Sequence, residues 1–193
     1  MVLNVPSSSC EKRYAMQFVV LTGASGSGKT TIAHAIEQRH AADVDVFYFD
    51  RIAVPPAKQM ITEYGSGEGW QRAKTIEWMV KLAPLSRSGR PLLFEGQTRL
   101  AFLAEGAEVA ADAAYLPILV DCDDETRSRR LALERKQPEL ANESMMDWAR
   151  YLRAEAGRCG CEILDTSMLS LEQCISHVMG RLNGNKSPGK GPP

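Results

Sequence analysis

A glycine-rich stretch near the amino terminus carries residue types that bind phosphate. Residues 18–31 read FVVLTGASGSGKTT and fit the pattern G-x-x-x-x-G-K-[ST]. Glycines let a backbone curl so that several N–H groups point at phosphate oxygens. The pattern expects Lys29 to reach the β- and γ-phosphates and the Thr30 hydroxyl to ligate Mg²⁺. The predicted nucleotide-binding residues are Gly23, Ala24, Ser25, Gly26, Ser27, Gly28, Lys29, Thr30 and Thr31.

The segments on either side of this loop agree with the motif. FVVLT before it has the apolar character of a buried strand, and TTIAHAIEQRH after it has the pattern of a helix. A helix that begins at the loop adds the positive end of its dipole. A merely flexible Gly/Ser loop is the alternative, but it does not explain this placement. We therefore expect a bound nucleoside triphosphate.

Apolar strand-like runs alternate with helical patterns along the chain. Strands this apolar are typical of a parallel sheet with helices on both faces, so we expect a three-layer α/β fold. The expected strands are 17–22, 45–49, 91–95, 114–120 and 161–164. The expected helices are about 28–40, 69–83, 98–110, 123–136, 144–157 and 170–182.

The composition of the chain argues against nucleic acid and membranes as binding partners. The 193 residues carry a formal net charge of -1, which gives no basic field for nucleic acid. We find no run of eighteen apolar residues and no signal-peptide pattern, so we expect a cytoplasmic protein with no membrane partner and with five reduced cysteines. We expect a flexible leader over 1–15, one domain over 16–182 and a disordered tail over 183–193.

From about residue 16 to 182 the chain resembles the P-loop small-molecule kinases, which include nucleoside-monophosphate, shikimate and gluconate kinases. We find no Asn-Lys-x-Asp guanine-reading element, since Asn185-Lys186 is followed by Ser-Pro, and no Leu-Ser-Gly-Gly transporter signature. The resemblance implies a five-stranded parallel sheet of order 2-3-1-4-5. It also implies an acceptor-binding arm at about 51–83 and a short arginine-bearing lid at about 127–143.

Two stretches at strand ends match the acceptor side of that family. Asp50 ends the second strand, where the resemblance implies a base for a hydroxyl acceptor, and Arg51 beside it could contact an anionic acceptor. Capping or pairing with Arg51 is the other interpretation of Asp50. Glu95-Gly-Gln97-Thr-Arg99 stands where adenylate-type kinases have Asp-Gly-x-Pro-Arg. Glu95 could hold Mg²⁺ through water, or cap the next helix, and Gln97 and Arg99 would face the acceptor.

Basic residues follow the fourth strand, where the resemblance places lid arginines. Arg130 and Arg135 would neutralise charge on the transferred phosphoryl group, unless the run is a solvated helix face. Asp165 and Thr166 occupy a turn that runs beside adenine in the family. In the arm, Trp70 could stack on an acceptor ring, although core packing is the more common role of such a residue.

These residues predict a kinase that uses ATP and Mg²⁺ and acts on a small molecule, as a monomer or homodimer. A hydroxyl acceptor is favoured by Asp50. The alternatives are a nucleoside-monophosphate kinase, a 5′-hydroxyl nucleic-acid kinase and a non-enzymatic regulator gated by nucleotide. Nucleic acid is disfavoured by the near-neutral net charge.

Overall fold

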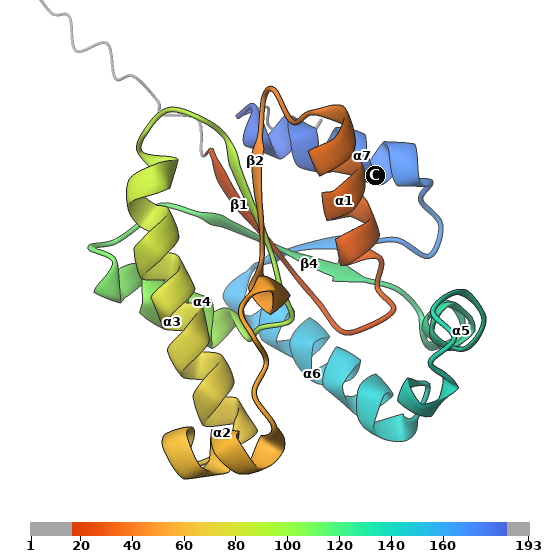
Figure 1. Ribbon diagram of the computed structural model, residues 1–193. Helices are drawn as coiled ribbons and strands as arrows, with labels where there is room; N and C mark the ends of the chain where they lie inside the picture. Colours follow the sequence, from red (N-terminus) through yellow and green to blue (C-terminus); the bar gives the residue numbers. More distant parts are fainter. Residues whose placement is uncertain (1–16, 185–193) are drawn as a thin grey trace, which may run out of the picture.

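The five apolar runs form one parallel sheet in the computed structural model, which describes residues 17–184 (Figure 1). The leader expected at 1–15 and the tail beyond residue 184 lie outside the described residues. The strand order is β2-β3-β1-β4-β5, which confirms the expected topology. The strands are β1 (Phe18–Thr22), β2 (Asp45–Tyr48), β3 (Leu92–Glu95), β4 (Leu116–Asp121) and β5 (Glu162–Asp165).

Helices cover both faces of the sheet. On one face α3, α4 and α6 pack against alternate strand residues such as Phe18 and Phe94, and on the other face α1 and α7 pack against Val19 and Leu93. This alternation is the period-2 pattern of a strand buried on both sides. The α-helices are α1 (Lys29–Arg39), α2 (Ala57–Tyr64), α3 (Gly67–Ser86), α4 (Leu100–Val109), α5 (Asp124–Arg129), α6 (Glu143–Cys159) and α7 (Leu171–Leu182).

Two segments differ from the sequence-based expectation. The region after β2 contains the additional short helix α2, which has no buried residue and projects from the body of the molecule in Figure 1. The single helix expected over 123–136 is instead α5 followed by a π-helical turn, Arg130–Glu134, in which the Arg135 N–H bonds to the Arg130 carbonyl. A π-turn accommodates one extra residue, and such turns are frequent at functional sites.

The register brings the strand ends together at one edge of the sheet. Glu95 pairs with both Leu21 of β1 and Tyr48 of β2, and Asp121 pairs with Asp165. In an open parallel sheet the carboxyl ends of the strands form the crevice where ligands bind. Among the helices of residues 17–184, none is both long enough and apolar enough to span a membrane.

Candidate functional site

The phosphate loop connects β1 to α1 through three glycines with positive φ. These are Gly23 at 151°, Gly26 at 80° and Gly28 at 95°. A Cβ on Gly23 would lie 2.1 Å from the carbonyl oxygen of Val120, so no other residue fits there. Gly28 is the N-cap residue of α1 and has no side chain that could accept a hydrogen bond. Among the described residues, the first N–H groups of α1 therefore gain no acceptor from a capping side chain. The loop therefore presents backbone donors at a helix N-terminus, which is a site for an anion.

Two arginines after β4 hold the outer side of this loop. Arg127 is completely buried and donates to the Ser25 carbonyl at 2.9 Å and to the Asp121 carboxylate at 2.5 Å. Arg130 donates to the Gly26 and Ser27 carbonyls at 3.4 and 3.3 Å. Three consecutive carbonyl oxygens of the loop thus bind guanidinium groups.

Thr166, in the turn after β5, completes this arrangement. Its hydroxyl donates to the Ser27 carbonyl at 2.8 Å and accepts from Arg130 at 2.8 Å. The neighbouring Asp165 is exposed, and its carboxylate accepts from the Ser167 N–H at 2.9 Å. Of the two residues predicted beside adenine, Thr166 therefore contacts the loop backbone and Asp165 shapes the turn.

Lys29 lies at the base of the loop between charged neighbours. Its ammonium group is 3.7 Å from the Glu95 carboxylate, which also accepts a 3.0 Å hydrogen bond from the Thr30 hydroxyl. Lys29 is 7% exposed and Glu95 is 4% exposed. Burial lowers the pKa of Lys29, while the negative charges of Glu95 and Asp50 act in the opposite direction. The structure thus brings Lys29, Thr30, Glu95 and Asp50 together, as the sequence predicts.

These groups fit a magnesium-nucleotide complex. The Thr30 and Glu95 oxygens are hard ligands on the rim of a donor-lined loop, and Mg²⁺ typically takes one or two protein oxygens with the rest from phosphate and water. In residues 17–184 no cluster of three or more His, Cys, Asp or Glu side chains forms a separate metal site. The hydroxyl of Ser27 is buried in the loop and has no hydrogen-bond partner among the described residues. Such a group suits a site whose ligand supplies acceptors.

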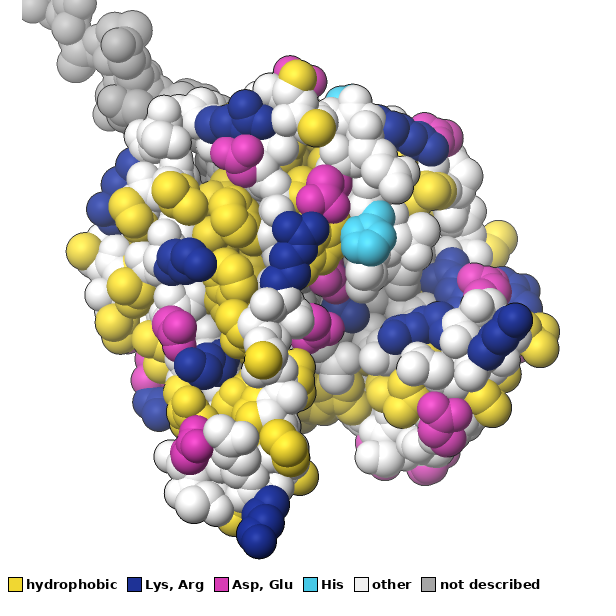
Figure 2. Space-filling view, in the orientation of Figure 1, with side chains coloured by type: hydrophobic (Ala, Val, Ile, Leu, Met, Phe, Trp, Pro, Cys, Tyr) yellow, Lys and Arg dark blue, Asp and Glu magenta, His cyan; other side chains and the backbone are white. Residues whose placement is uncertain are grey.

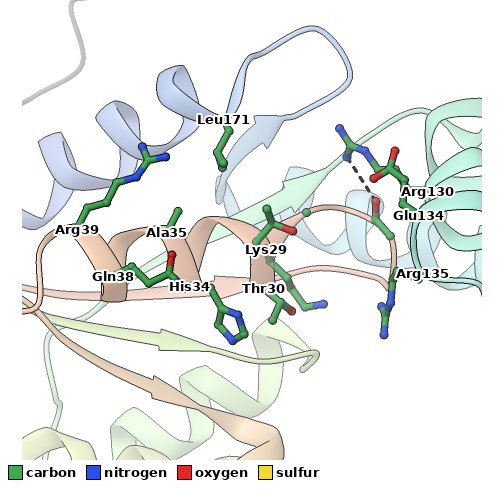
Figure 3. Close-up of a pocket in the computed structure, with 13 residues that line it drawn as sticks. Lys29, Thr30, His34, Ala35, Gln38, Arg39, Arg130, Glu134, Arg135 and Leu171 are labelled. Carbon is green, nitrogen blue, oxygen red and sulfur yellow. Dashed lines mark hydrogen bonds between the residues drawn. The ribbon is translucent and has the colours of Figure 1, made fainter.

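A groove extends from the loop over α1 (Figure 3). Its main cavity has a volume of about 510 Å³, and Lys29, Thr30, Arg130 and Arg135 lie around its loop end. An adjoining cavity of about 160 Å³ is more apolar and shares part of this wall. The adjoining cavity is lined by Gly28, Thr31, Ile32, Arg130, Glu134, Thr166, Leu169, Leu171 and Cys174.

The residues predicted for the acceptor side are in several local environments. Asp50 lies exposed in the 3₁₀ turn Phe49–Arg51, directly after β2. Arg51 turns away to Glu37 of α1 at 3.0 Å and lies over the Tyr48 ring. Gln97 accepts a 3.1 Å hydrogen bond from the Ser25 hydroxyl, which connects the loop after β3 to the phosphate loop.

Arg99 is held by both the arm and α6. It pairs with Glu68 of α3 at 2.8 Å and lies over the rings of Trp148 and Tyr151. Trp70, which could have stacked on an acceptor, is buried in the core with its ring nearly perpendicular to that of Phe49.

Sequence reasoning did not identify the contacts of Arg127, Glu155 and Glu68. Glu155 is buried on α6, and its carboxylate accepts from the Leu100 and Ala101 N–H groups, so it caps α4 from another helix. The Arg127–Ser25 contact joins residues 102 positions apart. A charged residue in a helical pattern carries no local signal of such distant partners.

Comparisons with known proteins agree with this geometry. The model of the AAA domain family matches residues 19–149, more than half of the chain. No curated protein sequence matches the chain.

Several solved structures with a similar fold are named as kinases. A shikimate kinase from Acinetobacter baumannii superposes with a TM-score of 0.58 at 16% identity, covering 88% of this chain and 94% of that one. A gluconokinase from Sinorhizobium meliloti gives 0.56 at 14%, covering 89% and 94%. A deoxyadenosine kinase from M. mycoides gives 0.56 at 13%, covering 86% and 99%. The chain therefore belongs to the AAA domain family, and its fold is that of the P-loop small-molecule kinases.

Proposed function

We propose that this protein is a magnesium-dependent kinase that transfers the γ-phosphoryl group of ATP to a hydroxyl group of a small molecule. One observation carries the proposal: buried Lys29 lies between the phosphate loop and the carboxylates at the ends of β2 and β3. The cation that would bind phosphate is thereby close enough to Asp50, a group that can accept a proton, for the Asp50 charge to act on the pKa of Lys29. The structural neighbours named as shikimate kinase, gluconokinase and deoxyadenosine kinase support a small-molecule acceptor.

The loop and Lys29 would hold the phosphates. The backbone N–H groups at the start of α1 would donate to phosphate oxygens, and Lys29 would lie against the β- and γ-phosphates. Thr30 and Glu95 would hold Mg²⁺, which supplies charge neutralisation at the phosphates when bound. Phosphoryl transfer needs mainly positioning and electrostatic stabilisation, so these groups address its main requirement.

Two arginines after β4 would contact the nucleotide, one near the transferred phosphoryl group and one near the purine ring. Arg135 lines the cavity, and its positive charge acts to lower the pKa of Lys29. It would approach the transferred phosphoryl group. Arg130 borders the smaller apolar cavity together with Thr166. That cavity would receive the purine ring, and the phosphates would extend from it toward Lys29.

Asp50 would remove the acceptor's proton. As the acceptor oxygen attacks the γ-phosphorus, its O–H bond breaks and the proton passes to the Asp50 carboxylate, while ADP leaves. The side chain is exposed and makes no hydrogen bond or ion pair within residues 17–184, so it is free to meet a hydroxyl group. A nucleoside monophosphate, the acceptor in the second candidate function, already presents an oxyanion and needs no base. The Gln97-Thr-Arg99 sequence is the observation that favours this second candidate.

Substitution of Asp50 tests the proposal. A transfer screen with sugars, nucleosides, nucleotides and antibiotics, measured as acceptor-dependent release of ADP, first identifies an acceptor. Asp50→Asn then keeps the shape and removes the base, so kcat should fall at least about 100-fold while ATP affinity by titration calorimetry is unchanged.

Asp43→Asn, an exposed aspartate just before the opposite end of β2, is the matched control and should keep full activity. A variant at Asp50 that loses only acceptor affinity, or loses nothing, would contradict the role of base. ATP turnover that no acceptor stimulates would instead favour a nucleotide-gated regulator. The proposal includes a cytoplasmic location and a monomeric or homodimeric state.

A further inference from the structure

Arg99, the arginine that the sequence predicts to face the acceptor, already has a carboxylate partner. Arg99 follows β3 at the start of α4, at the point where α3 and α6 approach the edge of the sheet. Figure 2 shows the molecule hollowed between the projecting arm and the lobe that carries α5, next to this edge. The Arg99 guanidinium lies 2.8 Å from the carboxylate of Glu68, which extends from the first turn of α3. The pair therefore carries no net charge at this end of the sheet.

Aromatic rings fix the neutralised arginine in place. The guanidinium carbon lies 5.4 Å from the Trp148 ring centre and 5.0 Å from that of Tyr151. These two rings stack on each other at 5.3 Å with an interplanar angle of 11°. An arginine held over aromatic faces in this way is costly to redirect. These contacts hold Arg99 beside Glu68 in this structure.

Two further arginines, from the segment after β2 and from α6, are also paired with carboxylates. Arg51 bonds to Glu37 at 3.0 Å, and Arg153 of α6 bonds to Asp121 at 2.6 Å. Lys58 of α2 is exposed to water, which screens the interactions of a single charge.

The two carboxylates nearest to Lys29, by contrast, have no arginine partner among residues 17–184. Asp50 has no ion-pair partner among residues 17–184, and Glu95 shares the single ammonium group of Lys29. That ammonium group belongs to the phosphate loop and would be engaged by ATP. A carboxylate or phosphate on the acceptor that lies next to Asp50 would therefore meet like charge, which costs affinity.

Building on the proposed function, we propose that the acceptor is an alcohol without an anionic group, neutral or positively charged, and that Glu68 determines this specificity by neutralising Arg99. The neutral groups nearby can bind hydroxyls. The Gln97 amide bonds to Ser25, and the Gln71 amide of the arm donates to the Gln97 carbonyl at 2.7 Å. Excluding a competitor by charge is a recognised route to specificity.

Matched pairs of acceptors test the charge preference. Each acceptor found by the transfer screen is compared with an analogue that carries an acidic group, for example glucose with gluconate and deoxyadenosine with its monophosphate. We expect kcat/KM to be at least about tenfold higher for the member without the acid. Equal or better use of the acidic member would overturn the inference while leaving the kinase function intact. If ATP binds but no acceptor of either kind is phosphorylated, the proposed function itself is overturned, and the inference with it.

Substitution of Glu68 tests the role of the ion pair. Glu68→Gln releases the charge of Arg99, so the preference for the neutral member should shrink about threefold or more, through a lower KM for the acidic analogue. Glu77→Gln breaks a comparable exposed pair with Lys74 on the same helix and should leave the preference unchanged. The double variant Glu68→Gln/Arg99→Gln should restore the original preference. An unchanged ratio in Glu68→Gln would show that Glu68 does not set specificity.

Discussion

Arg127 is a cation with no exposed surface, at the centre of the contacts between β4 and the phosphate loop. Its partners are the Asp121 carboxylate and the carbonyl oxygens of Ser25 and Cys122. A buried charge is tolerated when it is paired and hydrogen-bonded, and removing one partner exposes the other to the full cost of burial. Arg127 therefore positions the loop without reaching the ligand.

Replacing Arg127 should weaken both the fold and nucleotide binding. Arg127→Met leaves Asp121 with Arg153 as its remaining cation, so the free energy of unfolding should fall by about 3 kcal/mol. Denaturant unfolding measures this loss. Arg127→Lys keeps the positive charge but loses the planar guanidinium with its several N–H donors. This variant should fold, yet it should bind ATP more weakly because the Ser25 carbonyl loses its donor.

The neighbouring Arg129 is exposed on the same helix and provides the control. Arg129→Gln should change the free energy of unfolding by no more than about 0.5 kcal/mol. Equal effects of the Arg127 and Arg129 substitutions would contradict the role assigned to the buried arginine.

At the scale of elements, side chains connect the segment after β2 to α1. Glu37 of α1 accepts from the Tyr48 hydroxyl at 2.8 Å and from Arg51 at 3.0 Å. Partial burial acts to raise the pKa of Glu37, but these hydrogen bonds outweigh it and hold the pKa below 4.5. The ionised carboxylate thus helps to fix the turn that carries Asp50.

This connection should make stability depend on pH in a defined window. Because the folded pKa of Glu37 lies below its unfolded value of 4.5, its contribution is complete above pH 4.5 and is lost as pH falls through the folded pKa. Glu37→Gln should therefore lower the free energy of unfolding at pH 7, by no more than about 1 kcal/mol for a partly exposed pair. Urea unfolding at pH 3 to 7 should show the two proteins converging at the acidic end. Glu108→Gln, on an exposed part of α4, should show no such convergence.

Elements with a strong apolar period could be predicted from sequence, and elements without one could not. The strands lie within one or two residues of expectation because runs such as FVVLT are buried on both faces. Helix α2 has no buried residue, so no core requirement marks AKQMITEY as a helix. The π-turn depends on one extra residue between Arg130 and Arg135, which hydrophobic periodicity does not resolve.

The candidate site divides in the same way. The glycine loop, Lys29 and Thr30 follow from one contiguous motif, and Glu95 and Asp50 follow from the rule that strand ends share an edge. The pairing of Arg99 with Glu68 depends on how the arm folds back, 31 positions away in sequence. Contacts of this kind are set by tertiary packing and leave no local pattern. The assigned roles of all these residues remain predictions.

At the scale of the whole molecule, the phosphate loop is joined to the core through β1, β4 and β5. A ligand that binds only the folded loop should therefore stabilise the entire domain. A non-hydrolysable ATP analogue at about 100 times its Kd contributes roughly 2.7 kcal/mol, which corresponds to a rise in Tm of about 5–10 °C for a domain of this size. Differential scanning calorimetry measures the shift.

Lys29→Ala provides the comparison for this experiment. It removes the cation expected at the β- and γ-phosphates, so most of the shift should disappear while the protein still unfolds in one cooperative transition. A shift of the same size in Lys29→Ala would place the nucleotide somewhere other than the phosphate loop.

The three consecutive loop carbonyls that bind Arg127, Arg130 and Thr166 have a consequence for the rate of capture. Ordering a free backbone costs about 1–2 kcal/mol per residue, and a floppy loop would meet that cost each time a nucleotide arrived. Here the ordering takes place once, when the chain folds. The loop is then preorganised for phosphate, and a nucleotide has only to collide with it in a suitable orientation. Association should consequently be governed by diffusion and charge, with little delay from rearrangement of the loop.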